Sequence, residues 1–310
     1  MLKWKQERNG ATALLIQGAR RVGKSTIAEE FARNEYTSYI LIDFSKVSKA
    51  VADLFDDVSD LNYLFLRLQF IFNVQLHERS SVIVFDEVQL QPKARQAIKH
   101  LVKDRRYDYI ETGSLISVRS KSRDILIPSE ETKINLYPMD FEEFRWALGD
   151  DATIPLLRAA FEKKMSLGDA VHRKLMRDFR LYMLVGGMPQ AVVAYIETNN
   201  FTEVDTVKRD IIALYEEDFG KIDSSGRAKA LYDAIPAQLS RNASRYKVST
   251  AIPDDKKDRI MSAIAEVEDS MTVNIAYHVD DPHIGLALTR NEDSFKMSAS
   301  DTGLFATLAF

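Results

Sequence analysis

One nine-residue stretch has the residue types and the spacing needed to bind phosphate. It runs Gly18, Ala19, Arg20, Arg21, Val22, Gly23, Lys24, Ser25 and Thr26. Glycine allows backbone angles closed to other residues, so successive N–H groups can turn inward around a phosphate, helped by the positive end of a following helix. Lys24 can then reach the β- and γ-phosphates, while the Ser25 hydroxyl can ligate a bridging magnesium ion. An ordinary glycine-containing turn is the alternative, and the apolar run before the stretch and the helical segment after it argue against that.

A pair of carboxylates, Asp86 and Glu87, follows an apolar run at residues 82–85. A strand buried on both faces would place the pair at the sheet edge where ligands bind in open α/β folds. We expect Asp86 to hold magnesium through water or through Ser25, and Glu87 to orient the water that attacks the γ-phosphate. The alternative is a strand that ends in an acidic turn. The phosphate loop earlier in the chain favours a functional site over that turn, and the adjacent Glu87 favours hydrolysis of ATP.

A third candidate is the segment Thr112, Gly113 and Ser114, at the end of the next predicted strand. A short polar side chain there could sense the γ-phosphate or position the water, so Ser114 is predicted as catalytic beside Lys24 and Glu87; a plain turn is the alternative. Arg119, Lys121 and Arg123 follow, and Arg119 or Arg123 could act as an arginine finger, in cis or towards a neighbouring subunit. A solvated loop is the alternative for this basic cluster.

These residues lie at the ends of predicted strands that alternate with helices, which is the pattern of an α/β fold with a parallel sheet. The predicted strands cover residues 13–16, 39–43, 82–85, 109–112 and 134–136. The predicted helices among them cover residues 27–34, 61–72 and 92–102.

From about residue 144 the pattern is mainly helical. The predicted helices include residues 202–219, 228–239 and 255–267, and two predicted strands follow at 272–279 and 284–289. Helices followed by a β-hairpin predict a winged-helix-like module, which binds DNA in some proteins and other proteins in many. A basic stripe at Arg173, Arg177 and Arg180 is interpreted as a solvated helix face, with phosphate contact as the alternative.

Length and composition limit the classes of function. A chain of 310 residues is long for one core, so two domains are expected. The formal charge is −4, which leaves DNA contact possible but unsupported by net charge. The absence of cysteine excludes disulfides and thiolate chemistry. No signal peptide or apolar run of ~18 residues is present, so we expect a cytoplasmic protein without a membrane partner.

Several segments together resemble the prokaryotic AAA-superfamily ATPases that join an ATPase domain to a C-terminal domain of unknown function. In the first half these segments are GARRVGKST at 18–26, VIVFDEVQ at 82–89, ETGS at 111–114 and LYPMDFEEF at 136–144. In the second half they are LVGGMPQAV at 184–192, DIIALYEEDFGK at 210–221 and SASDTGLFATL at 298–308. The resemblance therefore spans nearly the whole chain.

The resemblance implies a P-loop AAA-type ATPase domain at residues 1–145, a helical lid or connecting region at 146–225, and a winged-helix-like domain at 226–310. It also implies that ATP and Mg²⁺ bind at Lys24, Ser25, Asp86 and Glu87. Members commonly continue into a segment similar to restriction-endonuclease folds. That segment is missing here, so we expect a truncated form or an early gene end and assign no nuclease role.

We therefore predict a magnesium-dependent ATPase whose ATP binding and hydrolysis rearrange its C-terminal domain. One alternative is a nucleotide-gated switch with little turnover, and another is an ATP-dependent DNA-associated protein. We expect an unidentified protein partner, and a homo-oligomer is possible.

Overall fold

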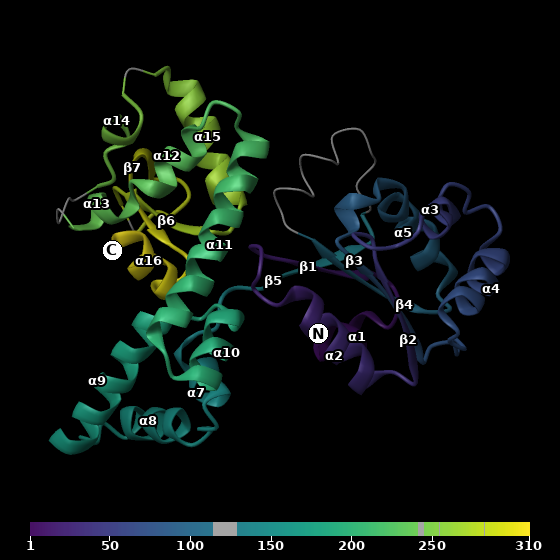
Figure 1. Cartoon of the computed structure of the whole chain (residues 1–310), viewed down its shortest axis with the longest axis horizontal. Helices are drawn as coiled ribbons and strands as arrows, with labels where there is room; N and C mark the ends of the chain where they lie inside the picture. Colours follow the sequence, from purple (N-terminus) through teal and green to yellow (C-terminus); the bar gives the residue numbers. More distant parts are fainter. Residues whose placement is uncertain (114–128, 241–244, 254, 282) are drawn as a thin grey trace. The chain divides into compact units, whose positions relative to one another are not determined.

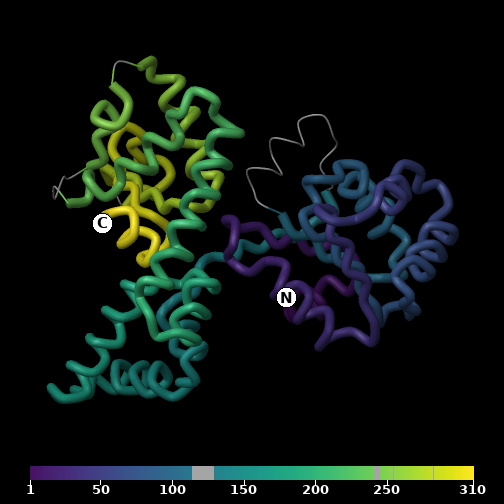
Figure 2. Tube along the Cα trace, in the orientation of Figure 1, coloured from purple at the N-terminus to yellow at the C-terminus, as the bar shows by residue number. Residues whose placement is uncertain are grey.

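The computed structural model describes residues 1–113, 129–240, 245–253, 255–281 and 283–310, which divide into two compact units (Figure 1). Unit 1 comprises residues 1–19 and 23–136, and unit 2 comprises residues 137–310 together with residues 20–22. The chain begins in unit 1 and ends in unit 2 (Figure 2). The division into an ATPase domain at 1–145, a helical region at 146–225 and a winged-helix-like domain at 226–310 remains a prediction.

Unit 1 is built on a parallel five-stranded sheet in the order β2-β3-β4-β1-β5. The strands are β1 Ala13–Gln17, β2 Ser38–Asp43, β3 Ser81–Asp86, β4 Asp108–Gly113 and β5 Glu131–Asn135. Each overlaps a predicted strand, and the predicted α/β fold class is confirmed. All six residues of β3 are buried, as expected for a strand covered on both faces.

Helices cover both faces of this sheet and enclose two apolar clusters. The elements are α1 Leu2–Arg8, α2 Lys24–Glu35, α3 Lys49–Ala52, the 3-10 turn η1 Asp53–Phe55, α4 Leu61–Phe72, the 3-10 turn η2 Val88–Leu90 and α5 Pro92–Asp104. On one face Leu14 and Ile16 pack with Ala28 of α2. On the other, Phe85 packs in the cluster that contains Ile98 of α5. The alternation of strand side chains thus builds a three-layer unit.

A buried charged cluster lies where α5 covers two strands. Arg95 donates to Glu131 at 3.3 Å, and its nearest nitrogen lies 4.0 Å from a carboxylate oxygen of Glu111. None of the three side chains is more than 1% exposed. Burial, together with the negative charge of Glu131, raises the pKa of Glu111 well above its ordinary value. Glu111 therefore keeps its proton in the folded chain at pH values where an unfolded glutamate is ionised.

This buried carboxyl predicts that the stability of unit 1 depends on pH. The folded state binds the Glu111 proton more tightly than the unfolded chain, so the stabilisation is complete below the unfolded pKa. It is lost as the pH rises, by up to about 1.4 kcal/mol per pH unit. Glutamine does not titrate, so Glu111→Gln should remove the part of the pH dependence of the unfolding free energy that Glu111 contributes. Urea unfolding between pH 5 and 8, followed by Trp4 fluorescence in a Trp146→Phe background, measures it.

The control is Glu78→Gln, since Glu78 is an exposed side chain of the same unit. This variant should keep the wild-type dependence of unfolding free energy on pH. If the unfolding free energies of Glu111→Gln and wild type depend equally on pH, Glu111 is not the buried group that binds the proton.

Unit 2 is mainly helical. Its helices are α7 Phe141–Ala147, α8 Thr153–Glu162, α9 Gly168–Val185, α10 Pro189–Thr198, α11 Phe201–Ile222, α12 Arg227–Asp233, α13 Ile235–Ser240, α14 Val248–Ala251, α15 Lys257–Asp269 and α16 Thr302–Ala309. Within the described ranges no single helix is long and apolar enough to cross a membrane. Only α9 and α10 taken together, bent by 117°, have the necessary length and composition.

Two sequence predictions in unit 2 are corrected. Residues 228–239 form two helices, α12 and α13, where one was predicted. The predicted strand at 284–289 is wrong, because β6 Val273–Val279 pairs antiparallel with β7 Arg290–Ala299. The residues 284–289 belong to the connection, and their apolar side chains are exposed. β7 is mostly polar, with only Phe295 and Met297 buried, so pairing with β6 rather than apolar content defines it.

Hydrogen bonds connect the turn between α9 and α10 to the C-terminal helix α16. Asp301 caps α16 by accepting from the N–H of Leu304 at 2.7 Å, and it also accepts from the N–H of Gly187 at 2.6 Å. Lys208 of α11 donates to the carbonyl of Leu184 at 2.9 Å and to that of Gly303 at 3.3 Å. Asp301 and Lys208 thus pair with backbone groups at the end of α9, in the turn that follows it and at the start of α16.

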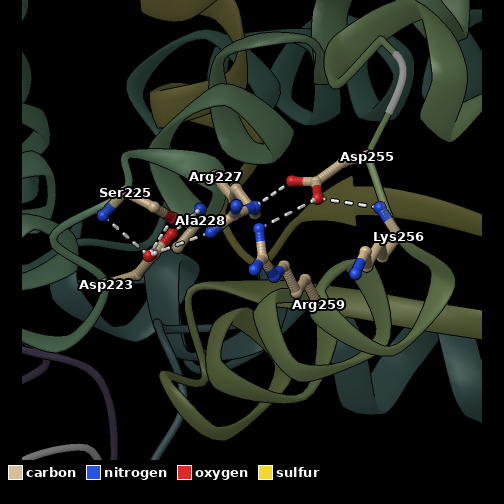
Figure 3. Close-up of polar contacts among 7 residues, drawn as sticks. All are labelled: Asp223, Ser225, Arg227, Ala228, Asp255, Lys256 and Arg259. Atoms are coloured by element: carbon tan, nitrogen blue, oxygen red, sulfur yellow. Dashed lines mark hydrogen bonds and ion pairs between the residues drawn. The ribbon is translucent and has the colours of Figure 1, made fainter.

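A polar cluster joins the start of α12 to the segment before α15 (Figure 3). Asp223 accepts from the N–H groups of Ser225 at 2.9 Å and Ala228 at 3.0 Å, which caps the start of α12. Arg227 donates a hydrogen bond to Asp255, and this contact lowers the pKa of Asp255 below its ordinary value. The cluster thus fixes two segments far apart in sequence.

Candidate functional site

The predicted phosphate loop connects β1 to α2. Gly23 caps the helix with φ of 94°, a left-handed conformation that favours glycine, and it has no side chain that could cap the first N–H groups of α2. Lys24 is 6% exposed, and its ammonium group donates to the carbonyls of Gly18 at 3.2 Å and Ala19 at 2.9 Å. The loop therefore surrounds a buried cation beside a helix N-terminus, which suits an anionic ligand.

Three oxygen-bearing side chains meet beside this loop. The Ser25 hydroxyl of α2 donates to Asp86 Oδ1 at 2.6 Å, and Asp86 ends β3. The hydroxyl of Thr112, near the end of β4, also donates to Asp86 Oδ1. Since the strands are parallel, their carboxyl ends lie at one edge of the sheet, and the loop after β1 lies at the same edge.

Glu87 follows directly in the left-handed conformation, with φ of 54°. Its backbone N–H donates to the hydroxyl of Thr112 at 3.2 Å, so Thr112 holds both members of the acidic pair. The side-chain amide of Gln89, itself 5% exposed, donates to the carboxylate of Glu87. A left-handed residue with a large side chain is uncommon outside turns and functional sites, and here it turns the chain away from β3.

The structure places Ser25 against Asp86, with Lys24 and Glu87 next to them in the chain, and the roles of these four residues remain predictions. Thr26 lies in the first turn of α2 and is exposed. Arg20, Arg21 and Val22 group with unit 2, and Arg21 has φ of 68°. Ser114 and the arginine-finger candidates Arg119 and Arg123, with Lys121, lie outside the described residues.

Two residues of this site were not predicted as site residues. Thr112 belongs to the third candidate segment, in which only Ser114 was assigned a role, yet its hydroxyl contacts Asp86 and the backbone N–H of Glu87. Gln89 had no signal of its own beyond its position two residues after Glu87. A polar residue one strand over from an acidic pair is the general signal that could have indicated Thr112.

The donor set at this edge suits magnesium. A hydroxyl and a carboxylate, from Ser25 and Asp86, lie within hydrogen-bond distance of each other, and both are hard oxygen ligands of the kind Mg²⁺ prefers. Among the described residues, no group of three or more His, Cys, Asp or Glu side chains could hold a metal ion by itself. A magnesium ion here would therefore depend on phosphate oxygens and water for its remaining ligands, as is usual for this ion.

A parallel sheet whose first strand leads through a glycine-lysine-serine loop into a helix defines unit 1 as a P-loop ATPase fold. The family comparison agrees. Residues 11–145 match the family model of an AAA domain, and residues 176–310 match that of a domain of unknown function, DUF8612. The predicted pairing of an AAA-superfamily domain with a C-terminal domain of unknown function is thus confirmed, and nucleotide binding follows at the level of the family.

Solved structures give more distant similarities. A Signal Transduction ATPase with Numerous Domains (STAND) protein with a tetratricopeptide repeat sensor, from Pyrococcus horikoshii, is 11% identical with a TM-score of 0.37. That match covers 100% of this chain and 42% of the other, so this chain spans less than half the length of that protein. A chain from the structure of Drosophila ORC bound to DNA is 13% identical with a TM-score of 0.35, covering 96% of this chain and 89% of the other. No curated protein sequence matches.

Proposed function

We propose that this protein is a magnesium-dependent ATPase that hydrolyses ATP to ADP and phosphate. One observation carries the proposal. The loop that holds Lys24 and Ser25 and the acidic pair Asp86 and Glu87 converge at one edge of the parallel sheet, with Ser25 and Asp86 in direct contact. Phosphoryl transfer requires a cation, a metal-binding oxygen pair and a group that positions water, and this edge supplies all three.

The ammonium group of Lys24 stabilises charge on the transferring phosphoryl group. In the structure it donates to two loop carbonyls, so ATP binding replaces these contacts at least in part by phosphate oxygens. Ser25 and Asp86 would hold magnesium, which would supply positive charge against the β- and γ-phosphates. Thr112 keeps the Asp86 carboxylate in place by hydrogen bonding.

Glu87 orients and polarises the attacking water and accepts its proton. Its position is fixed on two sides, because Thr112 accepts from its backbone N–H and Gln89 donates to its carboxylate. Gln89 is thus proposed as a positioning residue for Glu87. Ser114 is proposed as a further polar group of the site, on its place in the sequence after β4.

We also propose that ATP binding or hydrolysis rearranges unit 2. Unit 2 has its own buried core, separate from that of unit 1, so it can respond as a body. A second candidate function is a nucleotide-gated switch with little turnover. A Gln89–Glu87 contact that shifted the carboxylate away from the water on nucleotide binding would favour this candidate, since Gln89 already engages one of its two oxygens.

Nucleotide binding is tested first with Lys24→Met, which keeps the length of the side chain and removes its charge. Charge-assisted hydrogen bonds contribute about 1.5–3 kcal/mol, so the variant should bind Mg-ATP about 10- to 100-fold more weakly. Isothermal titration calorimetry of the full chain measures the affinity.

The matched control is Lys99→Met, an exposed lysine on α5 of the same unit, which should bind as wild type does. Circular dichroism checks that both variants are folded. No heat of binding from wild type with Mg-ATP, at protein concentrations suited to micromolar affinities, would refute the proposed function.

A further inference from the structure

Unit 2 carries a helical arm with little buried surface of its own. The arm consists of residues 153–185, which are α8, α9 and the connection between them (Figure 1). Only Ile154 of α8 and Val185 of α9 are fully buried in these two helices. Several large apolar side chains are exposed instead: Phe161 at 83%, Leu156, Met165 and Val171. These side chains lie on two consecutive helices and their connection, and large exposed apolar surfaces mark interaction sites.

The arm is also basic. It contains seven Lys and Arg residues against three Asp and Glu residues, in a chain whose net charge is −4. Arg158 pairs with Glu142, outside the arm. By contrast, the exposed basic side chains at the far end of the arm have no hydrogen bond or ion pair to any described residue: Lys163, Lys164, Arg173 and Lys174. The end of the arm therefore combines positive charge with exposed apolar groups.

The end of the β6–β7 hairpin has the opposite character. We call residues 280–281 and 283–293 the wing loop. Three of its apolar side chains are exposed, Leu288 at 79% and also Ile284 and Leu286. Its acidic residues are Asp280, Asp281, Glu292 and Asp293, against a single basic residue, Arg290.

The charges of the wing loop are only partly neutralised by neighbours. Asp293 pairs with Lys257 at 2.8 Å, and Asp281 contacts the ring of His283. Arg290 stacks its guanidinium group on the ring of Tyr277, 3.5 Å from its centre. Asp280 and Glu292 remain exposed. The wing loop is therefore an acidic surface with an apolar centre.

We propose that the wing loop of one copy of this chain binds the arm of a second copy. The two surfaces have complementary charge, and each exposes apolar side chains that the other can cover. The arm and the wing loop belong to the same unit, yet both are exposed, so they do not cover each other within one chain. Their contact joins two different surfaces, so the assembly is head-to-tail and grows into a ring or a filament.

Complementary charge selects a second copy over nucleic acid as the occupant. Phosphate groups would be attracted to the arm but repelled by the wing loop, and they would leave Phe161 and Leu288 exposed. A second copy covers both surfaces at once. A second copy is also available wherever the chain itself is present.

Association is tested by sedimentation velocity of the full chain from ~1 to ~100 µM. Wild type should increase in mass with concentration, and high salt should weaken the association because the charges are exposed. In the arm variant, Lys163→Glu, Lys164→Glu and Lys174→Glu are combined. In the wing variant, Asp280→Lys, Asp281→Lys and Glu292→Lys are combined. Each variant alone should be monomeric over this range.

An equimolar mixture of the two variants should associate again, because the unmodified arm of the wing variant meets the unmodified wing loop of the arm variant, and the acidic arm meets the basic wing loop. The control combines Lys3→Glu, Lys49→Glu and Lys99→Glu, which are exposed lysines of unit 1 that give the same change in net charge as the arm variant. It should associate as wild type does. A monomeric wild type, association that survives either reversal, or a mixture that stays monomeric would each overturn the proposal.

Discussion

Glu87→Gln is expected to lower the steady-state rate of phosphate release from ATP by about 10²–10⁴-fold, the usual contribution of a positioned general base. Glutamine keeps the shape of the side chain and its hydrogen-bonding capacity, but it cannot accept the proton of the attacking water. Affinity for Mg-ATP should change little, because the proposal assigns the phosphates and the metal to Lys24 and Ser25 rather than to Glu87. Turnover and calorimetric affinity, measured on the same preparation, separate these two effects.

Glu78→Gln provides the matched control, since the same chemical change is made on an exposed side chain of unit 1. It should turn over as wild type does. Two results would contradict hydrolysis by Glu87. One is turnover that is negligible in wild type and unchanged in the variant, which would favour the switch. The other is clear turnover that survives the substitution, which would place the water-positioning group elsewhere.

The core of the candidate site was predictable because its chemistry lies in short, local patterns. Glycine spacing, the lysine and the serine occur within nine residues, and the acidic pair lies at the end of a fully buried strand. In a parallel sheet such strand ends meet at one edge, whatever the order of the strands. Lys24, Ser25, Asp86 and Glu87 could therefore be assigned to one region without a structure.

The contacts that support these residues could not be predicted in the same way. Thr112 reaches Asp86 only because β4 lies beside β3, and this order is not encoded in any local pattern. The buried cluster of Arg95, Glu111 and Glu131 likewise depends on the packing of α5 over the sheet. Charged residues usually indicate solvent exposure, so a buried group of three is invisible to sequence patterning.

The error at β7 has a related cause. The apolar residues Ile284, Leu286 and Leu288 lie in the run predicted as a strand, but the structure leaves these side chains exposed. β7 itself has charged residues at Arg290, Glu292 and Asp293, and it is held by pairing with β6. Strand preference depends on neighbouring strands more than on composition, so the exposed apolar run was misassigned. The same run is the centre of the wing loop.

Gly187→Ala is expected to destabilise unit 2 by at least about 3 kcal/mol, the upper part of the range for overpacking a buried site. A Cβ at this position would lie 2.0 Å from the carbonyl oxygen of Met139 and 2.7 Å from its nitrogen. These are backbone atoms, so no change of rotamer relieves the clash. The backbone cannot easily move apart, because Met139 N donates to Gly187 O at 2.8 Å and Gly187 N donates to Asp301.

Urea unfolding of Trp4→Phe variants measures this effect, since Trp146 of α7 then reports on unit 2 alone. Gly220→Ala is the matched control. Gly220 lies inside α11 with nothing within 4 Å of a built Cβ, so alanine there should be neutral or stabilise by up to about 1 kcal/mol through its helix propensity. Equal midpoints for Gly187→Ala and Gly220→Ala would mean that the 137–140 segment does not pack against the turn before α10. The opposite shift of the two glycine variants would instead locate the loss at that one contact, because the chemical change is the same at both positions.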